Sequence, residues 1–236
     1  EFKVFSEPAN DKNSRIAALI VPEGEKIGRG QIDRYTDFVK EFGAKGLAYI
    51  KVDGESIADL SSPILKYLSE ECLKNILTAL KVKKGDLIFF GAGKEKIVND
   101  YMSRLIAKIG IDLHLLKDGF EACWITDFPM FEETSDGSLT SLHHPFTCPV
   151  ETELEKLGKL SPLEINSKAY DMVINGVEIG GGSIRIHKKA LQEKVFELLG
   201  LSEDEAQKKF GFFLKTLTTG CPPHGGIAFG LDRLAM

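Results

Sequence analysis

The chain has 236 residues, and its 35 acidic and 30 basic side chains give a formal net charge of −5 at pH 7, which argues against nucleic-acid binding through an overall basic surface. Hydrophobic residues make up 43% of the chain, so wholesale disorder is excluded, and no apolar run approaches the roughly 18 residues that a membrane span needs. The four cysteines form no C-x-x-C pair, so neither a zinc knuckle nor a disulfide framework is expected, and a reducing cytoplasm is the default location.

The first half of the chain predicts a compact unit of mixed strands and helices. Short apolar runs alternate with stretches whose apolar residues recur at helical spacing. Ser62 followed by Pro63 is typical of an N-cap and a first helical position, so a long helix is expected to begin there. Residues 91–94, G-A-G-K, lack the third glycine and the hydroxyl of phosphate-binding motifs and predict only a strand-to-helix turn. The expected strands are 15–21, 47–52 and 86–90, and the expected helices are 30–42, 62–80 and 94–109.

The second half begins at a seam near residues 115–122 and has a different texture. Glycines and prolines interrupt its strand signals, and residues 134–142 predict a polar loop. The expected strands are 123–128, an interrupted stretch over 170–187, and 225–230, and the expected helices are 188–199 and 203–217. Together the two halves indicate an α+β fold.

Asn175 and Gly176 are the strongest short signal for a β-hairpin with a two-residue type I′ turn. In that register Val173 lies opposite Glu178, and Asp171 points to the same side of the sheet. The two carboxylates are then diagonal neighbours about 7–8 Å apart. They repel each other unless a cation such as Mg²⁺ lies between them. The pair is therefore either part of a metal site or two scattered acids on a solvated sheet face.

Glycines 180–182 interrupt the strand that follows this turn. Glycines weaken a strand and are used where a ligand must approach the backbone closely, although a plain bulge is the alternative. Arg185, between Ile184 and Ile186, lies in a strand otherwise suited to a core, so it needs an anionic partner. Its planar guanidinium fits the carboxylate of a ligand or a buried acid of the protein, and both interpretations stay open.

Four histidines lie in this half, namely His143, His144, His187 and His224, and they raise the question of zinc. Their spacing matches no pattern of zinc ligands, so zinc is not expected. Because adjacent side chains of an extended chain point in opposite directions, at most one of His143 and His144 should face a given site.

Near the end of the chain, the expected strand 225–230 runs directly into Leu231, Asp232 and Arg233 at the start of a helix. A strand, a glycine and a helix start make a corner that favours anions. Arg233 is unexpected there, because a cation is disfavoured at a helix N-terminus. Either a bound polyphosphate offsets that cost, or Arg233 pairs with a nearby acid.

Taken together, four runs of the sequence resemble the bacterial-type aspartyl-tRNA synthetases, which are class II enzymes. The run at 226–234 is similar to class II motif 3. The first half, with G-A-K-G-L-A-Y-I-K-V at 43–52, resembles the insertion domain of the bacterial enzymes. The resemblance implies an insertion (GAD-like) domain over 1–118 and, over 119–236, the C-terminal part of the catalytic domain, an antiparallel sheet flanked by helices. The four runs are F-P-M-F-E-E at 128–133, H-H-P-F-T-C-P at 143–149, Y-D-M-V-I-N-G-V-E-I-G-G-G-S-I-R-I-H at 170–187 and G-I-A-F-G-L-D-R-L at 226–234.

The resemblance also implies roles for single residues. Asp171 and Glu178 would hold Mg²⁺ on the ATP phosphates, and Glu178 would belong to the ATP site itself. Arg185 would grip the side-chain carboxylate of L-aspartate, with His143 and His144 as further aspartate-binding residues. The ATP-binding end of motif 3 would consist of Gly230, Leu231, Asp232 and Arg233, with Arg233 on the γ-phosphate. The catalytic residues so implied are Glu178, Arg185 and Arg233.

The implied activity is that of an aspartate–tRNA ligase, which activates L-aspartate with ATP and transfers it to the 3′ end of tRNA(Asp). The resemblance also implies a cytoplasmic homodimer that uses Mg²⁺ with ATP and does not associate with a membrane. The sequence contains no run similar to the anticodon-binding barrel, to motif 1 or to motif 2, so this chain alone is expected to be inactive. An inactive synthetase paralogue and an asparaginyl-tRNA synthetase-like enzyme are the alternatives.

Overall fold

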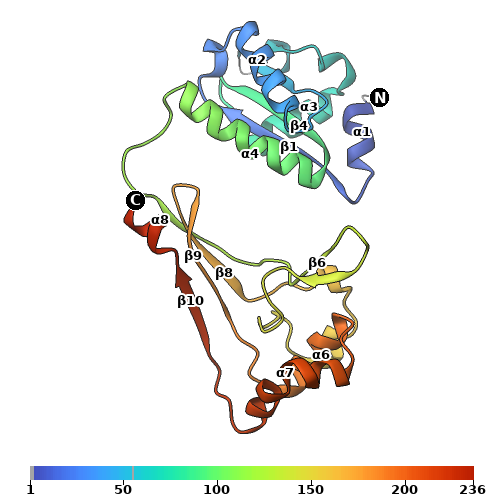
Figure 1. Ribbon diagram of the computed structural model, residues 1–236. Coiled ribbons are helices and arrows are strands. Elements are labelled where there is room, and N and C mark those ends of the chain that lie inside the picture. The colour runs from blue at the N-terminus through green and yellow to red at the C-terminus, as the bar shows by residue number, and fades with distance from the viewer. Residues whose placement is uncertain (1–2, 55) are drawn as a thin grey trace. The chain divides into compact units, whose positions relative to one another are not determined.

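The computed structural model describes residues 3–54 and 56–236, so residues 1, 2 and 55 of the expected first domain lie outside the described residues. The chain divides into two units, which meet in the sequence between Lys117 and Asp118, and each is described by itself (Figure 1). Both units combine helices with antiparallel sheets, so the predicted α+β fold class is confirmed. Among the described residues, no helix is both long and apolar enough to cross a membrane.

Unit 1, which ends at Lys117, is built on a four-stranded antiparallel sheet. Its strands lie in the order β1-β4-β2-β3, so β4 is held between β1 and β2. The alternation of side chains along β4 sends Leu87 and Phe89 into one apolar cluster and Ile88 and Phe90 into the other. This double burial explains why the strand reads L-I-F-F. The strands are β1 (Ser14–Val21), β2 (Ala48–Val52), β3 (Leu60–Ser61) and β4 (Leu87–Lys94).

Helices cover both faces of this sheet. The first cluster packs α2 and α4 against one face through buried side chains such as Tyr35 and Leu105. The second cluster includes Leu73 of α3 and Phe5 of α1, whose ring centroid lies 5.7 Å from that of Phe90. The helices are α1 (Lys3–Ala9), which the sequence did not predict, α2 (Arg29–Lys40), α3 (Glu70–Leu80) and α4 (Glu95–Asp112), with 3₁₀ turns η1 (Gly24–Lys26), η2 (Ile57–Asp59) and η3 (Leu65–Tyr67).

Two predictions in unit 1 are wrong in their boundaries. The long helix does not begin at Ser62, because the Ser62 hydroxyl donates to the carbonyl oxygen of Tyr49 in β2 and accepts from the amide of Ile64. The helix begins after Ser69, whose side chain accepts from the amide of Cys72 as an N-cap. Residues 91–94 do not form a turn. They extend β4, where they pair with the first residues of β1.

Unit 2 begins at Asp118, and a second four-stranded antiparallel sheet is its largest element. The strand order is β10-β9-β8-β5, so the hairpin of β8 and β9 is the centre of the sheet (Figure 1). A separate two-stranded ribbon follows, and its turn and second strand lie in residues 134–142, the region expected as a polar loop. There Asp136 and Gly137 form the turn, and Gly137 has a φ of +82°. The strands are β5 (Ala122–Ile125), β6 (Phe131–Glu133), β7 (Leu139–Ser141), β8 (Ala169–Ile174), β9 (Val177–Ile184) and β10 (Gly225–Phe229).

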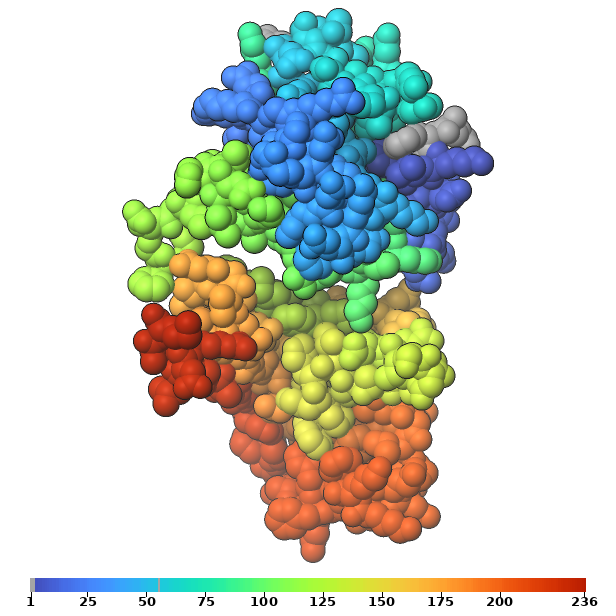
Figure 2. All heavy atoms as spheres, turned by 45° about the horizontal axis from the view of Figure 1, so that its top comes forward, coloured from blue at the N-terminus to red at the C-terminus, as the bar shows by residue number. Residues whose placement is uncertain are grey.

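Helices α6 and α7 of unit 2 pack against Phe146, in the stretch that follows β7. Helix α7 starts with a capping box between Ser202 and Glu205, and Phe196 of α6 stacks on Phe210 of α7 at a centroid distance of 5.0 Å. Residues 222–236 are exposed throughout, and Figure 2 shows the C-terminal residues in dark red at the surface. The helices are α5 (Leu154–Leu157), α6 (Lys189–Leu198), α7 (Glu203–Thr218) and α8 (Leu231–Ala235), with the 3₁₀ turn η4 (Pro162–Glu164).

Candidate functional site

The β8–β9 hairpin carries two carboxylates onto one face of the sheet. Asn175 and Gly176 form its turn with φ angles of +50° and +80°, as the type I′ signal predicts. Glu178 pairs with Val173 as expected. The register then shifts by one residue at Ile179, so the partner of Asp171 is Gly181. This shift is a β-bulge, which bends the strand.

The bulge brings the two carboxylates together over bare backbone. A Cβ atom added to Gly181 would lie 2.7 Å from Oδ1 of Asp171 and 3.2 Å from Oε1 of Glu178. Burial and the charge of Glu178 raise the pKa of Asp171, whereas nearby His143 lowers it. The predicted convergence of Asp171 and Glu178 on one face is therefore observed, and glycine at position 181 leaves the space between them open. Two carboxylates with a mutual repulsion fit a hard cation such as Mg²⁺.

Arg233 lies against the same bulge. Its Nη1 donates to the carbonyl oxygen of Glu178 at 2.6 Å and lies 3.9 Å from Oε2 of that residue. The amide of Gly230, just before α8, donates to the carbonyl of Ile179 at 2.8 Å. The structure thus gives Arg233 a nearby acid, which was one of the two sequence interpretations. Leu231 and Asp232 lie between these contacts and are exposed.

Arg185 follows directly after β9 and has no acidic partner. Its amide donates to the carbonyl of His224 at 2.9 Å, and its backbone bridges to Thr147. In the part of the chain that the structure describes, no Asp or Glu lies within ion-pair distance of its guanidinium, so the pair with a protein acid, one of the two open interpretations, is not observed. Its Nη1 instead contacts the imidazole of His144, 3.2 Å from Nδ1 and also close to Nε2.

The ring of His144 is held from its other side by the loop that carries it. The amide of Phe146 donates to Nδ1 at 3.2 Å, and the hydroxyl of buried Thr147 lies 3.3 Å from the same nitrogen. Burial and the charge of Arg185 lower the pKa of His144. A neutral imidazole whose Nδ1 accepts carries its proton on Nε2. In this assigned tautomer Nε2–H faces the Arg185 guanidinium, which contacts the ring directly and has no carboxylate partner among the described residues.

The neighbouring histidine reaches a different partner. The exposed ring of His143 lies 4.9 Å from the ring centroid of Phe128, and its charge lowers the pKa of Asp171. The two adjacent histidines therefore serve the two ends of the candidate site, His143 near the acids and His144 near Arg185. Within residues 3–54 and 56–236 no group of three or more His, Cys, Asp or Glu side chains is placed to hold a metal ion by itself.

A cavity of about 270 Å³ opens beside Arg185. The aromatic rings of Phe146 and Phe213 line it together with the backbone of the first glycines of β10. Sequence reasoning did not assign these phenylalanines. Phe146 stands inside the H-H-P-F run, whereas Phe213 belongs to the apolar face of α7 and carries no signal of its own.

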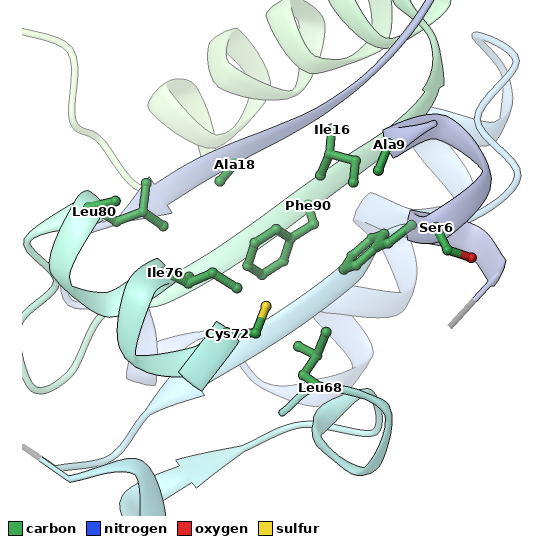
Figure 3. A pocket seen from close by; sticks show the side chains of 11 residues that line it. Ser6, Ala9, Ile16, Ala18, Leu68, Cys72, Ile76, Leu80 and Phe90 are labelled. Atoms are coloured by element: carbon green, nitrogen blue, oxygen red, sulfur yellow. The ribbon is translucent and has the colours of Figure 1, made fainter. Parts of the chain in front are cut away.

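A second cavity, of about 420 Å³, lies in unit 1 between α1, α3 and the sheet (Figure 3). Its walls are almost entirely carbon, with Phe90, Leu68 and Ile76 around the thiol of Cys72. Among the residues that the structure describes, no charged side chain lines it, so this cavity offers neither an acid, a base nor an anion-binding group.

Comparison with known proteins identifies the family. Residues 33–236 match the family described as tRNA synthetases class II (D, K and N), where the letters denote aspartate, lysine and asparagine. A putative aspartyl-tRNA synthetase from Leishmania major Friedlin is 21% identical with a TM-score of 0.36, and the match covers 56% of this chain and 21% of that one. The aspartyl tRNA synthetase from Entamoeba histolytica is 20% identical with a TM-score of 0.36, covering 58% and 22%. The chain spans about a fifth of the length of these two proteins. Because the family match extends over most of its residues, the chain belongs to the class II tRNA synthetases (D, K and N).

Proposed function

We propose that this chain is part of an aspartyl-tRNA synthetase, of the bacterial type that its motifs resemble. The observation that carries the proposal is the set of guanidinium donors on Arg185, which contact the imidazole of His144 and meet no Asp or Glu within ion-pair distance among the described residues. Of the three amino acids of the family, lysine would bring a second cation to these donors, and asparagine would lose the charge-assisted pair with the guanidinium. Of the three, only aspartate supplies a side-chain carboxylate to the guanidinium.

The remaining groups of the site suit the ATP half of the reaction. Asp171 and Glu178 would hold Mg²⁺, and Arg233 and the exposed start of α8 from Gly230 would face the polyphosphate. When bound, Mg²⁺ neutralises charge on the phosphates and fixes their orientation. The α-carboxylate of aspartate attacks the α-phosphate of ATP, and pyrophosphate leaves. The aspartyl group of the resulting aspartyl-adenylate then passes to a hydroxyl at the 3′ end of tRNA(Asp), and AMP leaves. The side chains of this chain bind and orient, and none needs to act as a covalent nucleophile.

The same proposal includes the assembly, the cellular location and the tRNA partner of the whole protein. Regions that supply motif 1 and motif 2 would complete the catalytic domain, a homodimer would form through motif 1, and the first unit would be the insertion domain. The expected location is the cytoplasm, and tRNA(Asp) is the expected macromolecular partner.

The test is ATP–pyrophosphate exchange by the protein extended to its initiating methionine, with aspartate, asparagine, lysine and glutamate in parallel. We expect exchange with aspartate alone, and none at a useful rate from residues 1–236 by themselves. Exchange with asparagine would favour the asparaginyl alternative, and exchange with none of the four would favour the inactive paralogue.

One variant makes this test specific for the surroundings of Arg185 and His144, the carboxylate recess. Arg185→Leu should raise the aspartate KM at least about tenfold, because a hydrogen bond to a charged group contributes about 1.5–3 kcal/mol, and should leave the ATP KM within about twofold. Arg104→Leu, which removes an exposed arginine paired with Asp100 on α4, is the matched control and should change neither. Equal increases in both KM values after Arg185→Leu would contradict the role of Arg185.

A further inference from the structure

Gln192 in α6 is a polar side chain in an apolar place. It is fully buried, with 0% of its surface exposed, beside the buried Leu191 and Val195 of the same helix. Its Nε2 donates to the carbonyl oxygen of Pro145 at 2.8 Å. Its Oε1 is also buried and accepts no hydrogen bond from the residues that the structure describes.

The buried amide makes one hydrogen bond and leaves one group unpaired. Its Nε2 satisfies the carbonyl oxygen of Pro145, whereas its Oε1, buried without a donor, opposes folding. The opposite orientation of the amide is excluded, because it would place Oε1 against the carbonyl oxygen of Pro145. What Gln192 adds to the molecule is therefore a single donor, fixed on a rigid helix and directed at one peptide group.

That peptide group connects Gln192 to His144. The carbonyl of Pro145 and the amide of Phe146 belong to the same planar unit, in which they point in opposite directions. Gln192 holds the carbonyl, and the amide on the other side donates to Nδ1 of His144 at 3.2 Å. Any rotation of this peptide plane would release both hydrogen bonds together. The proton on Nε2 of His144, and its direction toward Arg185, thus depend on the plane that Gln192 fixes.

We propose that Gln192 is a positioning residue for the carboxylate recess, which acts through the Pro145–Phe146 peptide on the imidazole of His144. The proposal rests on the proposed function, because the recess is taken to receive the aspartate side chain. Its Nε2 donates to Pro145 and not to Arg185 or His144. Gln192 affects the orientation of the His144 ring when a carboxylate binds.

The test uses Gln192→Met in this chain, because methionine has a similar length and no hydrogen-bonding amide. The charged groups around His144 are Arg185 and His143. If the peptide plane loosens, the ring loses the donor on Nδ1 and becomes more solvated, so the pKa of His144, followed by nitrogen NMR of the ring, should rise toward the ordinary value of about 6.5. The melting temperature should change little, because methionine removes the unpaired Oε1 and the donor to Pro145 together.

Val195→Ala is the matched control, since it opens a cavity on the same helix without touching Pro145. It should lower the melting temperature and leave the pKa of His144 unchanged. An unchanged His144 pKa in Gln192→Met, the same pKa change in both variants, or unfolding of Gln192→Met would assign Gln192 to packing and overturn the proposal.

A kinetic readout in the protein extended to its initiating methionine separates the two proposals. Gln192→Met should raise the aspartate KM about tenfold with the ATP KM within about twofold, as expected for a displaced donor to a charged group. If the parent protein gave no exchange with aspartate, the proposed function would fall, while the His144 pKa in residues 1–236 would still decide the role of Gln192.

Discussion

Asp171 and Arg185 are the two residues of the site whose charges the described part of the chain leaves uncompensated. Asp171 has a second carboxylate as its neighbour, and Arg185 has an imidazole. A ligand that satisfies both must bring a cation to one place and an anion to the other. A metal-bound nucleotide beside an acidic amino acid has this distribution of charge, which is why these two residues suit one composite substrate site.

The pH dependence of stability should reveal that the charged form of Asp171 is unfavourable in the folded protein. Its folded-state pKa is raised, so the fold loses stability as the pH rises from the ordinary carboxyl pKa through the raised value. Asp171→Asn removes this loss. The variant should be more stable than the parent near about pH 7, by about 0.2–1 kcal/mol, the size of a cross-strand charge effect. Near about pH 3, where the carboxyl is protonated in both states, the two should be equal.

Thermal melts at the two pH values would measure this difference. Glu132→Gln, which neutralises an exposed acid on β6, is the control and should shift neither melt. A stabilisation by Asp171→Asn that is the same at both pH values would point to packing rather than charge.

Single residues of the site differ in how far the sequence could predict them. The Asn175–Gly176 turn predicts that Asp171 and Glu178 share a face, whereas the bulge at Ile179, which places Asp171 opposite Gly181, was not predicted. Gln192 could not be found in this way. It stands in the helix run K-A-L-Q-E-K, where a glutamine is ordinarily solvated, and it is buried only because the loop around Pro145 folds back over α6. Contacts between distant segments decide such positions.

At the scale of elements, the glycines of β9 allow β10 to approach closely. A Cβ atom at Gly182 would lie 2.0 Å from the carbonyl oxygen of Gly226, a backbone atom that cannot turn aside. Gly226 is the neighbour of Ile227, the residue that pairs with Gly182, yet a Cβ atom there would meet nothing within 4 Å. The two strands therefore respond differently to the same added methyl group.

We expect Gly182→Ala to destabilise unit 2 by about 1–3 kcal/mol, the usual cost of overpacking, because β10 must move away from β9. Gly226→Ala should change the free energy of unfolding by less than about 0.5 kcal/mol. Chemical denaturation of both variants would measure the difference. Equal losses would show that the β9–β10 pairing does not limit the stability of unit 2.

Element boundaries show what the sequence leaves undecided. Ser62 and Ser69 both carry helix-start signals, Ser62 through Pro63 and Ser69 through the acidic first turn that follows it. The hydroxyl of Ser62 is taken by a strand carbonyl 13 residues away, so only Ser69 caps a helix. The local signals are equivalent, and the tertiary partner makes the choice. Helix α1 was not predicted for a different reason. It buries no residue fully, and its apolar side chains show no clear helical period.

At the scale of the whole molecule, each unit has cores of its own. The two clusters of unit 1 draw every buried residue from within that unit, on the two faces of a single sheet. The family match nevertheless begins at Asp33 and runs through both units. The change in texture near residues 115–122 predicts a domain seam in this region, and the chain divides into its two units between Lys117 and Asp118.

Residues 1–117 should therefore fold without the rest of the chain. We expect this segment to unfold cooperatively, with a melting temperature equal to that of the corresponding transition in the 236-residue chain. Near-ultraviolet circular dichroism of its tyrosines, Tyr35 and Tyr101 among them, would follow the tertiary packing. A segment with native secondary structure but no cooperative melt would show that unit 1 needs unit 2.

The close approach at Gly182 also limits how this protein can vary over time. Glycine has no smaller substitute, so every replacement at that position adds a carbon where the Gly226 carbonyl already stands. Genetic drift can only worsen the fit there, whereas Gly226 can accept several side chains at little cost. Among descendants of this protein, glycine should be retained at position 182 and replaced freely at position 226, although both are glycines in neighbouring strands.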